Sequence, residues 1–356
     1  MTQLAARPLD SADLRARFDA RLAEFLRQQG PGWPDGAPRG LPSTLNRFVL
    51  AGGKRLRPMF CYWGWRSAGG ADTEAIITAA SALELFHAFA LIHDDIMDGS
   101  ERRRGEPSVH QFFADRHARS SWRGDAARYG RNTALLCGDL CAAWADQMFH
   151  DCGLAREQVH RGYAVFAGMR TEVIAGQYLD LVSGVGDGSA ASALTVIRMK
   201  AARYTVTRPL QIGAALAGAG EDLLTAYASF GDPLGDAFQL RDDVLGVFGD
   251  PAVTGKSVLD DLREGKRTVM MAFARDRATR AQAARIKELF GCPGLDEDGA
   301  AELRRIIVDT GARDGTERLI ETRLSAALTA LAEAPVPEEV AAHLARLADG
   351  AVNRQS

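Results

Sequence analysis

The sequence predicts an all-α fold, in which long helices carry the functional residues and face a central apolar cavity. Apolar residues recur with helical spacing along most of the chain. Alternating runs of β-branched residues bounded by turns, the usual sign of strands, are not evident. With 356 residues, 46% of them hydrophobic, the chain is long enough to bury a large core. A bundle of long helices accounts for all three observations.

The first expected helix is amphipathic and covers residues 10–29, and the turn-rich residues 30–42 end it. The later expected helices are residues 59–67, 73–97, 132–152, 157–182, 193–219, 223–247, 268–275, 281–290, 296–311 and 314–331.

Three loops are expected between these helices. Residues 120–131 are polar and basic, residues 183–192 are rich in glycine and serine, and residues 249–268 are too charged for a core. The third loop carries Lys256 and Lys266, so it could close over bound phosphate as a lid.

No fixed-period repeat and no convincing domain boundary interrupts the chain. We therefore predict one catalytic helical domain, residues 43–335. An N-terminal helix with its connection, residues 1–42, precedes the domain, and a C-terminal helix or tail, residues 336–356, follows it.

Charge and cysteine content narrow the function classes. A net charge of -3 gives no reason to expect nucleic acid or an anionic membrane as a partner. The five cysteines show no metal-binding spacing, and their odd number argues against a disulfide framework. The N-terminus resembles neither a signal peptide nor an anchor, and no stretch reaches the roughly 18 apolar residues that span a bilayer. We expect a cytoplasmic protein without a membrane span.

Two acidic clusters, residues 91–105 and 238–250, each end an apolar helical run and carry basic residues. In the first, Asp94 and Asp98 are four residues apart, so on a helix they lie on one face. Paired carboxylates suit magnesium, which is usually held by one or two carboxylates together with substrate phosphates. Arg102, Arg103 and Arg104 follow, and guanidinium groups pair well with phosphate.

Such carboxylate pairs are more often a solvated helix face than a metal site, and an arginine triplet is usually surface charge. The apolar run before Asp94 and the second acidic cluster favour a functional site. Together they indicate one site in which carboxylates hold metal against a polyanion.

Three motifs follow one another in the chain. Residues 52–58 read GGKRLRP, residues 94–98 read DDIMD with RRG at 103–105, and Gln239 precedes RDD at 241–243. This ordered set, over roughly residues 46–268, resembles the trans-isoprenyl diphosphate synthases, or polyprenyl synthetases, and most of all the geranylgeranyl diphosphate synthases.

The resemblance implies an isoprenoid-synthase helical fold and a prenyltransferase. An allylic diphosphate ionises with loss of magnesium-bound pyrophosphate, and isopentenyl diphosphate attacks the cation before a proton is lost. By this resemblance Asp94, Asp98 and Asp242 hold magnesium, with three ions expected when substrate is bound. Arg103, Lys200 and Lys256 add positive charge around the same diphosphate.

The resemblance also implies a basic pocket for the diphosphate of isopentenyl diphosphate, formed by Lys54, Arg57, His87 and Arg104. Lys266 matches a further phosphate contact and Gln239 a polar residue lining the site. Gln177 and Asp180 match residues that support the site indirectly. No protein base is obvious for the final proton loss, and the released pyrophosphate is a plausible acceptor.

The chain departs from the family pattern in three places. In the loop from Lys256 to Asp261, Val258 and Leu259 replace a glycine that the family usually has. The second acidic motif normally has a third carboxylate where this chain has Gly246, and a hydroxyl residue often follows Lys200 where this chain has Ala201. Compensation for Gly246 is open among Asp243, Asp250, Asp260 and Asp261.

Product length depends, by the same resemblance, on the residues five and four positions before Asp94, which are Phe89 and Ala90. One aromatic residue beside a small one matches the C20 pattern. We expect geranylgeranyl diphosphate, with C15 farnesyl diphosphate as the next candidate.

Two other function classes stay open. A terpene cyclase also ionises a diphosphate but needs no second diphosphate pocket. A noncatalytic synthase subunit is suggested by Gly246 alone. The resemblance further implies a homodimer, and the small residues at 213–220 would permit close helix packing.

Overall fold

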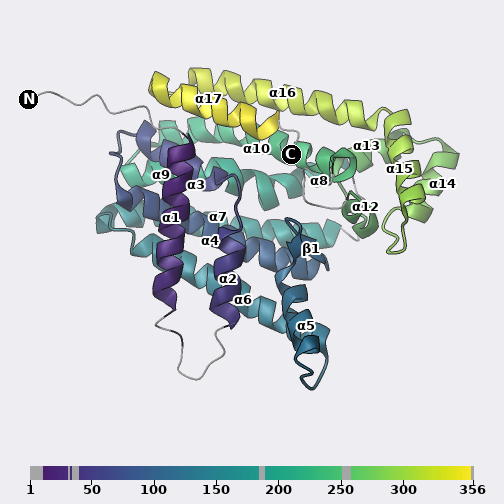
Figure 1. Ribbon diagram of the computed structural model, residues 1–356. Coiled ribbons are helices and arrows are strands. Elements are labelled where there is room, and N and C mark those ends of the chain that lie inside the picture. Colours follow the sequence, from purple (N-terminus) through teal and green to yellow (C-terminus); the bar gives the residue numbers. More distant parts are fainter. Residues whose placement is uncertain (1–10, 31–32, 34–39, 184–188, 251–257, 354–356) are drawn as a thin grey trace, which may run out of the picture. The chain divides into compact units, whose positions relative to one another are not determined.

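The computed structural model describes residues 11–30, 33, 40–183, 189–250 and 258–353, and most of these are helical (Figure 1). The all-α prediction is confirmed. The chain forms two compact units. Unit 1 contains Met1–Ile96, Val109–Val165 and Pro209–Ala219, and unit 2 contains Met97–Ser108, Phe166–Arg208 and Gly220–Ser356.

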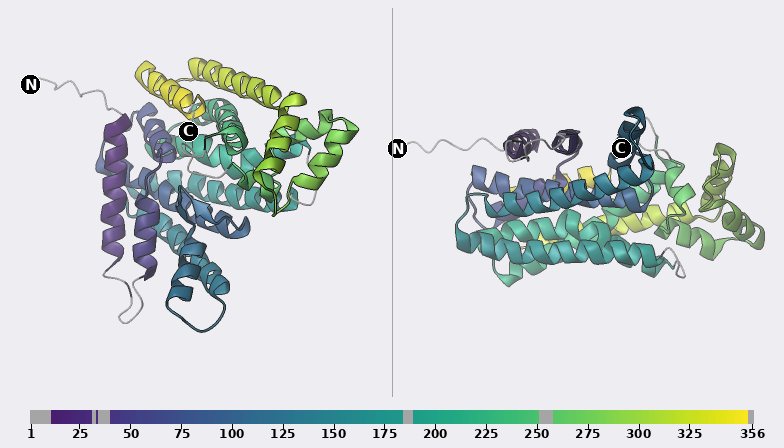
Figure 2. Two further views of the ribbon diagram at one scale, coloured as in Figure 1. Left: turned by 45° about the vertical axis from the view of Figure 1, so that its right-hand side comes forward. Right: turned by 90° about the horizontal axis from the view of Figure 1, so that it is seen from below.

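Unit 1 is built around the apolar helices that follow the first connection. Its elements are α1 (Ser11–Gln29), α2 (Gly40–Leu50), α3 (Leu56–Ser67), α4 (Glu74–Met97), α5 (Val109–Arg119), α6 (Ala126–His150), the first part of α7 (Arg156–Ser183) and α9 (Arg208–Ala217). The last residue of α4 and the first residue of α9 are assigned to unit 2. Helices α1 and α2 lie side by side, as the views in Figures 1 and 2 agree.

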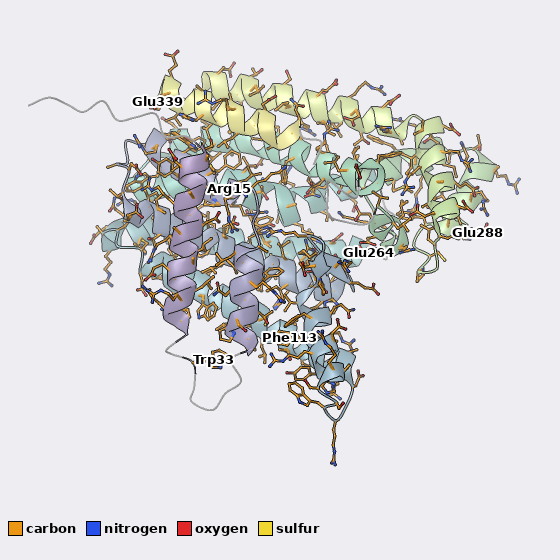
Figure 3. All side chains as sticks on the ribbon, in the orientation of Figure 1. Arg15, Trp33, Phe113, Glu264, Glu288 and Glu339 are labelled. Carbon is orange, nitrogen blue, oxygen red and sulfur yellow. The ribbon has the colours of Figure 1, made fainter. Side chains whose placement is uncertain are left out.

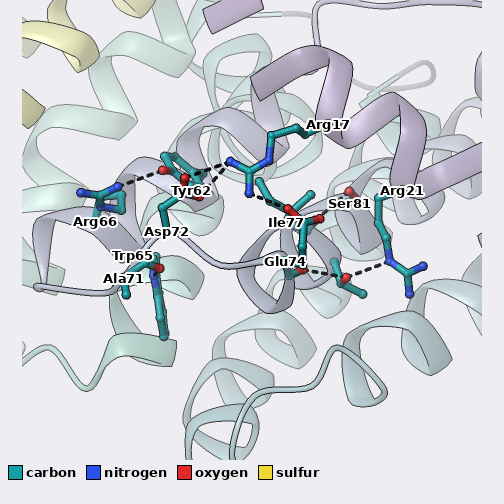
Figure 4. Close-up of polar contacts among 11 residues, drawn as sticks. Arg17, Arg21, Tyr62, Trp65, Arg66, Ala71, Asp72, Glu74, Ile77 and Ser81 are labelled. Carbon is teal, nitrogen blue, oxygen red and sulfur yellow. Dashed lines mark hydrogen bonds and ion pairs between the residues drawn. The ribbon is translucent and has the colours of Figure 1, made fainter. Parts of the chain in front are cut away.

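Helix α1 belongs to the packed part of unit 1. It buries an apolar face that includes Phe18 and Leu22. Arg17 forms ion pairs with Asp72 (2.9 Å) and Glu74 (2.7 Å), which are shown in Figure 4. Hydrophobic burial and these polar contacts together hold α1 in place.

Helices α3 and α9 approach closely through glycine. A side-chain Cβ at Gly213 would stand 1.8 Å from the carbonyl oxygen of Cys61, and one at Gly64 would stand 2.1 Å from that of Leu210. The first part of the small-residue run at 213–220 therefore packs within unit 1, where backbone meets backbone.

Unit 2 is organised around the long helix α10 (Glu221–Phe248), which packs against α16 (Ala312–Glu333). Its other elements are the rest of α7, α8 (Ala190–Ile197), η1 (Arg198–Thr207), α12 (Asp260–Glu264), α13 (Val269–Arg277), α14 (Arg280–Leu289), α15 (Glu297–Asp309), α17 (Glu338–Val352), and the strands β1 (Arg102–Arg103) and β2 (Glu106–Pro107). Charged side chains such as Glu288 of α14 and Glu339 of α17 are exposed (Figure 3).

Several local expectations were wrong. Helix α2 begins inside the expected turn-rich connection, α5 was not expected, and α6 starts within the expected loop at 120–131. The expected helix over residues 193–219 contains the π-helix η1, whose wider turns apolar periodicity does not reveal. The hairpin of β1 and β2 was also missed, since two-residue strands carry no alternation.

Helix α4 has the length and apolar composition of a membrane span, contrary to the expectation that no segment reaches that length. Most of its apolar window, 72%, is buried inside the structure. The core helix of a folded protein has the same composition, so α4 is weak evidence for a span.

Candidate active site

The first acidic motif straddles the end of α4. Asp94 lies in the last turn of the helix, and Asp98 follows its final residue, Met97. The expectation that Asp94 and Asp98 lie together on one helical face is therefore wrong for Asp98, which stands in the turn after the helix. Asp94 is partly buried and Asp98 is exposed. A helix C-terminus carries partial negative charge, which favours a bound cation.

The basic motif forms the loop that enters α3. Its backbone takes left-handed angles at Gly52 (φ 90°) and Arg55 (φ 50°). Lys54 is exposed and Arg57 is partly buried in the first turn of α3. This turn places the two predicted phosphate-binding side chains on either side of Arg55.

Arg55 was not predicted as a site residue, yet its side chain is anchored by residues of three helices. Its buried guanidinium pairs with Glu84 of α4 (2.7 Å) and Asp19 of α1 (2.7 Å), and it donates to the carbonyl oxygen of Val49 (2.9 Å). The desolvation cost of a buried charge is offset only when it is paired in this way. Arg55 thus fixes the loop that carries Lys54 and Arg57.

The arginine triplet lies on the hairpin. Arg103 of β1 pairs in register with Glu106 of β2. Arg104 (φ 53°) and Gly105 (φ 78°) form the two-residue turn, whose positive angles suit a tight hairpin. Arg103 is partly buried and Arg104 is exposed, so the two side chains differ in setting.

Lys200 lies in η1 and contacts Asp180, one of the two residues predicted to support the site. Its ammonium pairs with Asp180 of α7 at 2.7 Å. A Cβ at Gly176 would stand 2.4 Å from the backbone nitrogen of Lys200, so glycine lets η1 approach α7. The buried Nε2 of Gln177 has no hydrogen-bond acceptor among the described residues. That atom is a donor available to a ligand.

The second acidic motif lies near the end of α10, where Asp243 is almost fully buried. Its Oδ1 accepts from Gln239 Nε2 (3.2 Å) and lies 3.3 Å from Lys266 Nζ. Asp261 of α12 lies 3.8 Å from the same ammonium. The negative charges of Asp261 and Asp243 raise the pKa of Lys266, and burial raises the pKa of Asp243.

Asp261 occupies the space beside Gly246. Its Oδ2 is 2.2 Å from the point where a Cβ at position 246 would stand. A side chain at position 246 and the present Asp261 conformation therefore exclude one another. Among the four carboxylates left open as compensation, Asp261 is the one that fills this space.

The predicted residues are distributed over both units. Unit 1 holds Lys54, Arg57, His87, Phe89, Ala90 and Asp94. Unit 2 holds Asp98, Arg103, Arg104, Lys200, Gln239, Asp242 and Lys266. Lys256 lies outside the described residues.

The donor set suits magnesium. Asp94, Asp98 and Asp242 are carboxylates, the oxygen ligands that this ion prefers. The described residues contain no cluster of three or more side chains of the kind that could hold a metal ion alone. A magnesium ion bound mainly by phosphate and water needs no such cluster.

The sequence pattern of one protein family, described as polyprenyl synthetase, matches residues 39–307. The chain belongs to the polyprenyl synthetase family. A geranylfarnesyl diphosphate synthase of Aeropyrum pernix is 37% identical over 285 residues, covering 79% of this chain and 83% of that relative. A (2E,6E)-farnesyl diphosphate synthase of Mycobacterium bovis is 31% identical over 331 residues, covering 91% of this chain and 84% of that relative.

Solved structures agree with this membership. The geranylgeranyl pyrophosphate synthase of Corynebacterium glutamicum, solved with isoprenyl diphosphate and magnesium, superposes with a TM-score of 0.93 at 39% identity. The match covers 97% of this chain and all of that chain. This polyprenyl synthetase is thus a prenyltransferase of isoprenoid biosynthesis in a magnesium-dependent family, as predicted.

Proposed function

We propose that this polyprenyl synthetase joins an allylic diphosphate to isopentenyl diphosphate in trans and makes mainly C20 geranylgeranyl diphosphate. The observation that carries the proposal is the pair of acidic motifs at the ends of two long helices. Asp94 and Asp98 stand at the end of α4, and Asp242 stands near the end of α10. The lysines and arginines of the basic motifs would bind the diphosphate groups.

In the first step the bond between the allylic carbon and its diphosphate oxygen breaks. Magnesium, bound by Asp94, Asp98 and Asp242, would neutralise charge on the leaving pyrophosphate, with three ions expected in the substrate complex. Arg103, Lys200 and Lys256 add positive charge there. The Asp180 carboxylate holds the Lys200 ammonium, so the group is oriented before substrate arrives.

In the second step the double bond of isopentenyl diphosphate attacks the allylic cation, a carbon–carbon bond forms, and one proton leaves. Lys54, Arg57, His87 and Arg104 bind the diphosphate of this substrate. Arg55 holds the loop that carries the first two. The released pyrophosphate accepts the proton, because it lies beside the reacting carbons.

Product length is assigned to Phe89 and Ala90 on α4. The curated relatives include farnesyl and geranylfarnesyl diphosphate synthases, so relationship alone fits shorter and longer products than C20. Phe89 is packed against Phe86 at 5.3 Å between ring centroids. Phe89→Ala should give longer products, and unchanged length in that variant would remove Phe89 from this role.

We also propose a cytoplasmic homodimer. Helix α7 exposes an apolar stripe at helical spacing, formed by Ile174, Tyr178, Leu181 and Val182. Such a stripe favours burial against a second copy. Tyr178→Arg combined with Ile174→Glu should yield monomers in light scattering, whereas a wild-type protein that is already monomeric would contradict the dimer. Fractionation of cells of the source organism would test the location.

Two substitutions test the two diphosphate sites separately. Arg57→Ala should raise KM for isopentenyl diphosphate more than KM for the allylic primer. Asp242→Asn should lower kcat by at least about tenfold, the scale expected for a lost transition-state interaction. It should also raise the magnesium concentration needed for half-maximal rate. Equal effects of Arg57→Ala on both substrates would contradict the assigned pockets. Allylic ionisation without isopentenyl incorporation would instead indicate a cyclase.

A further inference from the structure

His93 lies directly before Asp94 on α4 and has no part in the chemistry described above. Its ring contacts Phe89, one turn earlier, with centroids 4.7 Å apart and an interplanar angle of 63°. Phe89 in turn packs on Phe86 at 5.3 Å. The three rings therefore form a row along one side of α4, with Phe89 between the other two.

Helix α6 fixes the far side of the His93 ring. The Nε2 atom lies 3.2 Å from the carbonyl oxygen of Leu135. A carbonyl oxygen can only accept a hydrogen bond, so Nε2 carries a proton and donates it to this oxygen. Asp139, also on α6, lies 3.7 Å from the same nitrogen. The ring is thus held in one orientation from outside its own helix.

Gly138 provides the space for this arrangement. A Cβ at position 138 would stand 2.2 Å from Nε2 and 2.3 Å from Cδ2 of His93. Glycine inside a helix costs about 0.5–1 kcal/mol relative to alanine, so it usually has a packing reason. Here the reason is the His93 ring, which only glycine admits against α6.

We propose that His93 and Gly138 are specificity-determining residues that act through Phe89. Gly138 admits the His93 ring, the bond to Leu135 orients it, and the ring restrains the rotamer of Phe89. Product length is then set by this packed unit and not by Phe89 alone. The inference rests on the proposed assignment of product length to Phe89.

The test is the product distribution of the full-length enzyme with magnesium, isopentenyl diphosphate and an allylic primer. His93→Ala removes the packing behind Phe89 and lets its ring move away from the growing chain. The ratio of longer products to the wild-type product should rise by about tenfold, the scale of discrimination expected for a change of one small group in an apolar pocket. An unchanged distribution in a folded, active His93→Ala enzyme would overturn the proposal.

A second comparison shows whether His93 acts through Phe89. In a Phe89→Ala background, His93→Ala should cause no further shift in product length. An equal shift in both backgrounds would mean that His93 acts independently, which contradicts the proposal. This pattern of non-additivity is not expected from general loss of stability.

Gly138→Ala provides an independent variant that leaves both aromatic residues in place. The added methyl group must displace His93, so the fraction of the wild-type product should fall. Gly168→Ala on α7 is the matched control, since its added methyl group meets nothing within 4 Å and it should leave the distribution unchanged. If His93→Ala does not fold, Gly138→Ala decides the question by the same readout.

The outcome is separable from failure of the proposed function. If the wild-type enzyme incorporates no isopentenyl unit, the proposed reaction itself fails. If it makes a product other than C20, the C20 assignment fails, while the shift between wild type and His93→Ala still tests the role of His93.

Discussion

At the residue scale, the departure at Gly246 has a structural counterpart in Asp261. The Asp261 carboxylate stands where a side chain at position 246 would begin, and it lies near the Lys266 ammonium. Helix α12 thus places a carboxylate beside the position on α10 where the usual carboxylate is missing. Gly246 gives no support to a noncatalytic subunit, because its space is already used by an acidic group.

We predict that Gly246→Asp, which restores the usual motif, lowers activity. The new side chain would displace Asp261 and place two carboxylates together, so kcat/KM should fall by about tenfold. Combining it with Asp261→Ala should recover part of the loss, measured under the same magnesium titration. A fully active Gly246→Asp enzyme would refute this reading of the pair.

The buried pair of Arg55 and Glu84 leads to a prediction on stability. Glu84→Ala leaves a buried guanidinium without its buried partner, and should lower the free energy of unfolding by about 3 kcal/mol. Asp19→Ala is the control, because the Asp19 carboxylate is 39% exposed, and it should cost about 1 kcal/mol or less. Denaturant unfolding of both variants measures the difference. Equal losses of unfolding free energy in the two variants would show that burial of the carboxylate does not decide how much it stabilises the fold.

The residue types and their order in the motifs sufficed to predict the family and the class of reaction. They did not reveal the role of Arg55, because its two carboxylate partners, Asp19 and Glu84, are 36 and 29 residues away in the chain. They did not single out Asp261 either. Its position beside Gly246 depends on how α12 packs against α10.

At the element scale, helices with strong apolar periodicity were predicted well, whereas a helix with proline in its first turn and a π-helix were missed. Helix α10 was expected over residues 223–247 and runs over Glu221–Phe248. Helix α2 was missed because Pro42 lies in its first turn, where proline is tolerated but resembles a break. The π-helix η1 was missed because it depends on close packing with α7 and α10, which sequence periodicity does not record.

Two glycines of α7 give a matched test of that packing. Gly176→Ala should displace η1 and with it Lys200, because the new Cβ would meet the Lys200 backbone at 2.4 Å. Gly168→Ala meets nothing within 4 Å and should stabilise the helix by about 0.5–1 kcal/mol. Thermal unfolding and kcat measured for both variants check the contrast. A harmless Gly176→Ala would show that close approach does not position η1.

At the scale of the whole molecule, the chain is a helical prenyltransferase whose predicted site residues are drawn from both units. The sequence alone predicts the domain limits 43–335. The structure adds that α1 is packed within unit 1 and that residues 338–352 form the helix α17. In our proposal product length depends on side-chain packing around Phe89, which motif order does not encode.

The thiols give a prediction about the intact protein. All five cysteines are free, and burial raises the pKa of the Cys61, Cys137, Cys141 and Cys152 thiols. Only Cys292 is partly exposed. A thiol reagent at neutral pH should therefore modify Cys292 first, since thiolate and access both govern the rate. Peptide mapping that finds another cysteine modified first in the folded protein would contradict the structure.

Prenyl transfer by this enzyme can be tested directly by incubating the purified protein with magnesium and labelled isopentenyl diphosphate. C5, C10 and C15 allylic diphosphates would be supplied in separate reactions, and the products would be dephosphorylated and separated by chromatography. We predict a linear C20 alcohol as the main labelled product. Incorporation that ends at another length would contradict the C20 assignment, and no incorporation with any primer would contradict the proposed reaction.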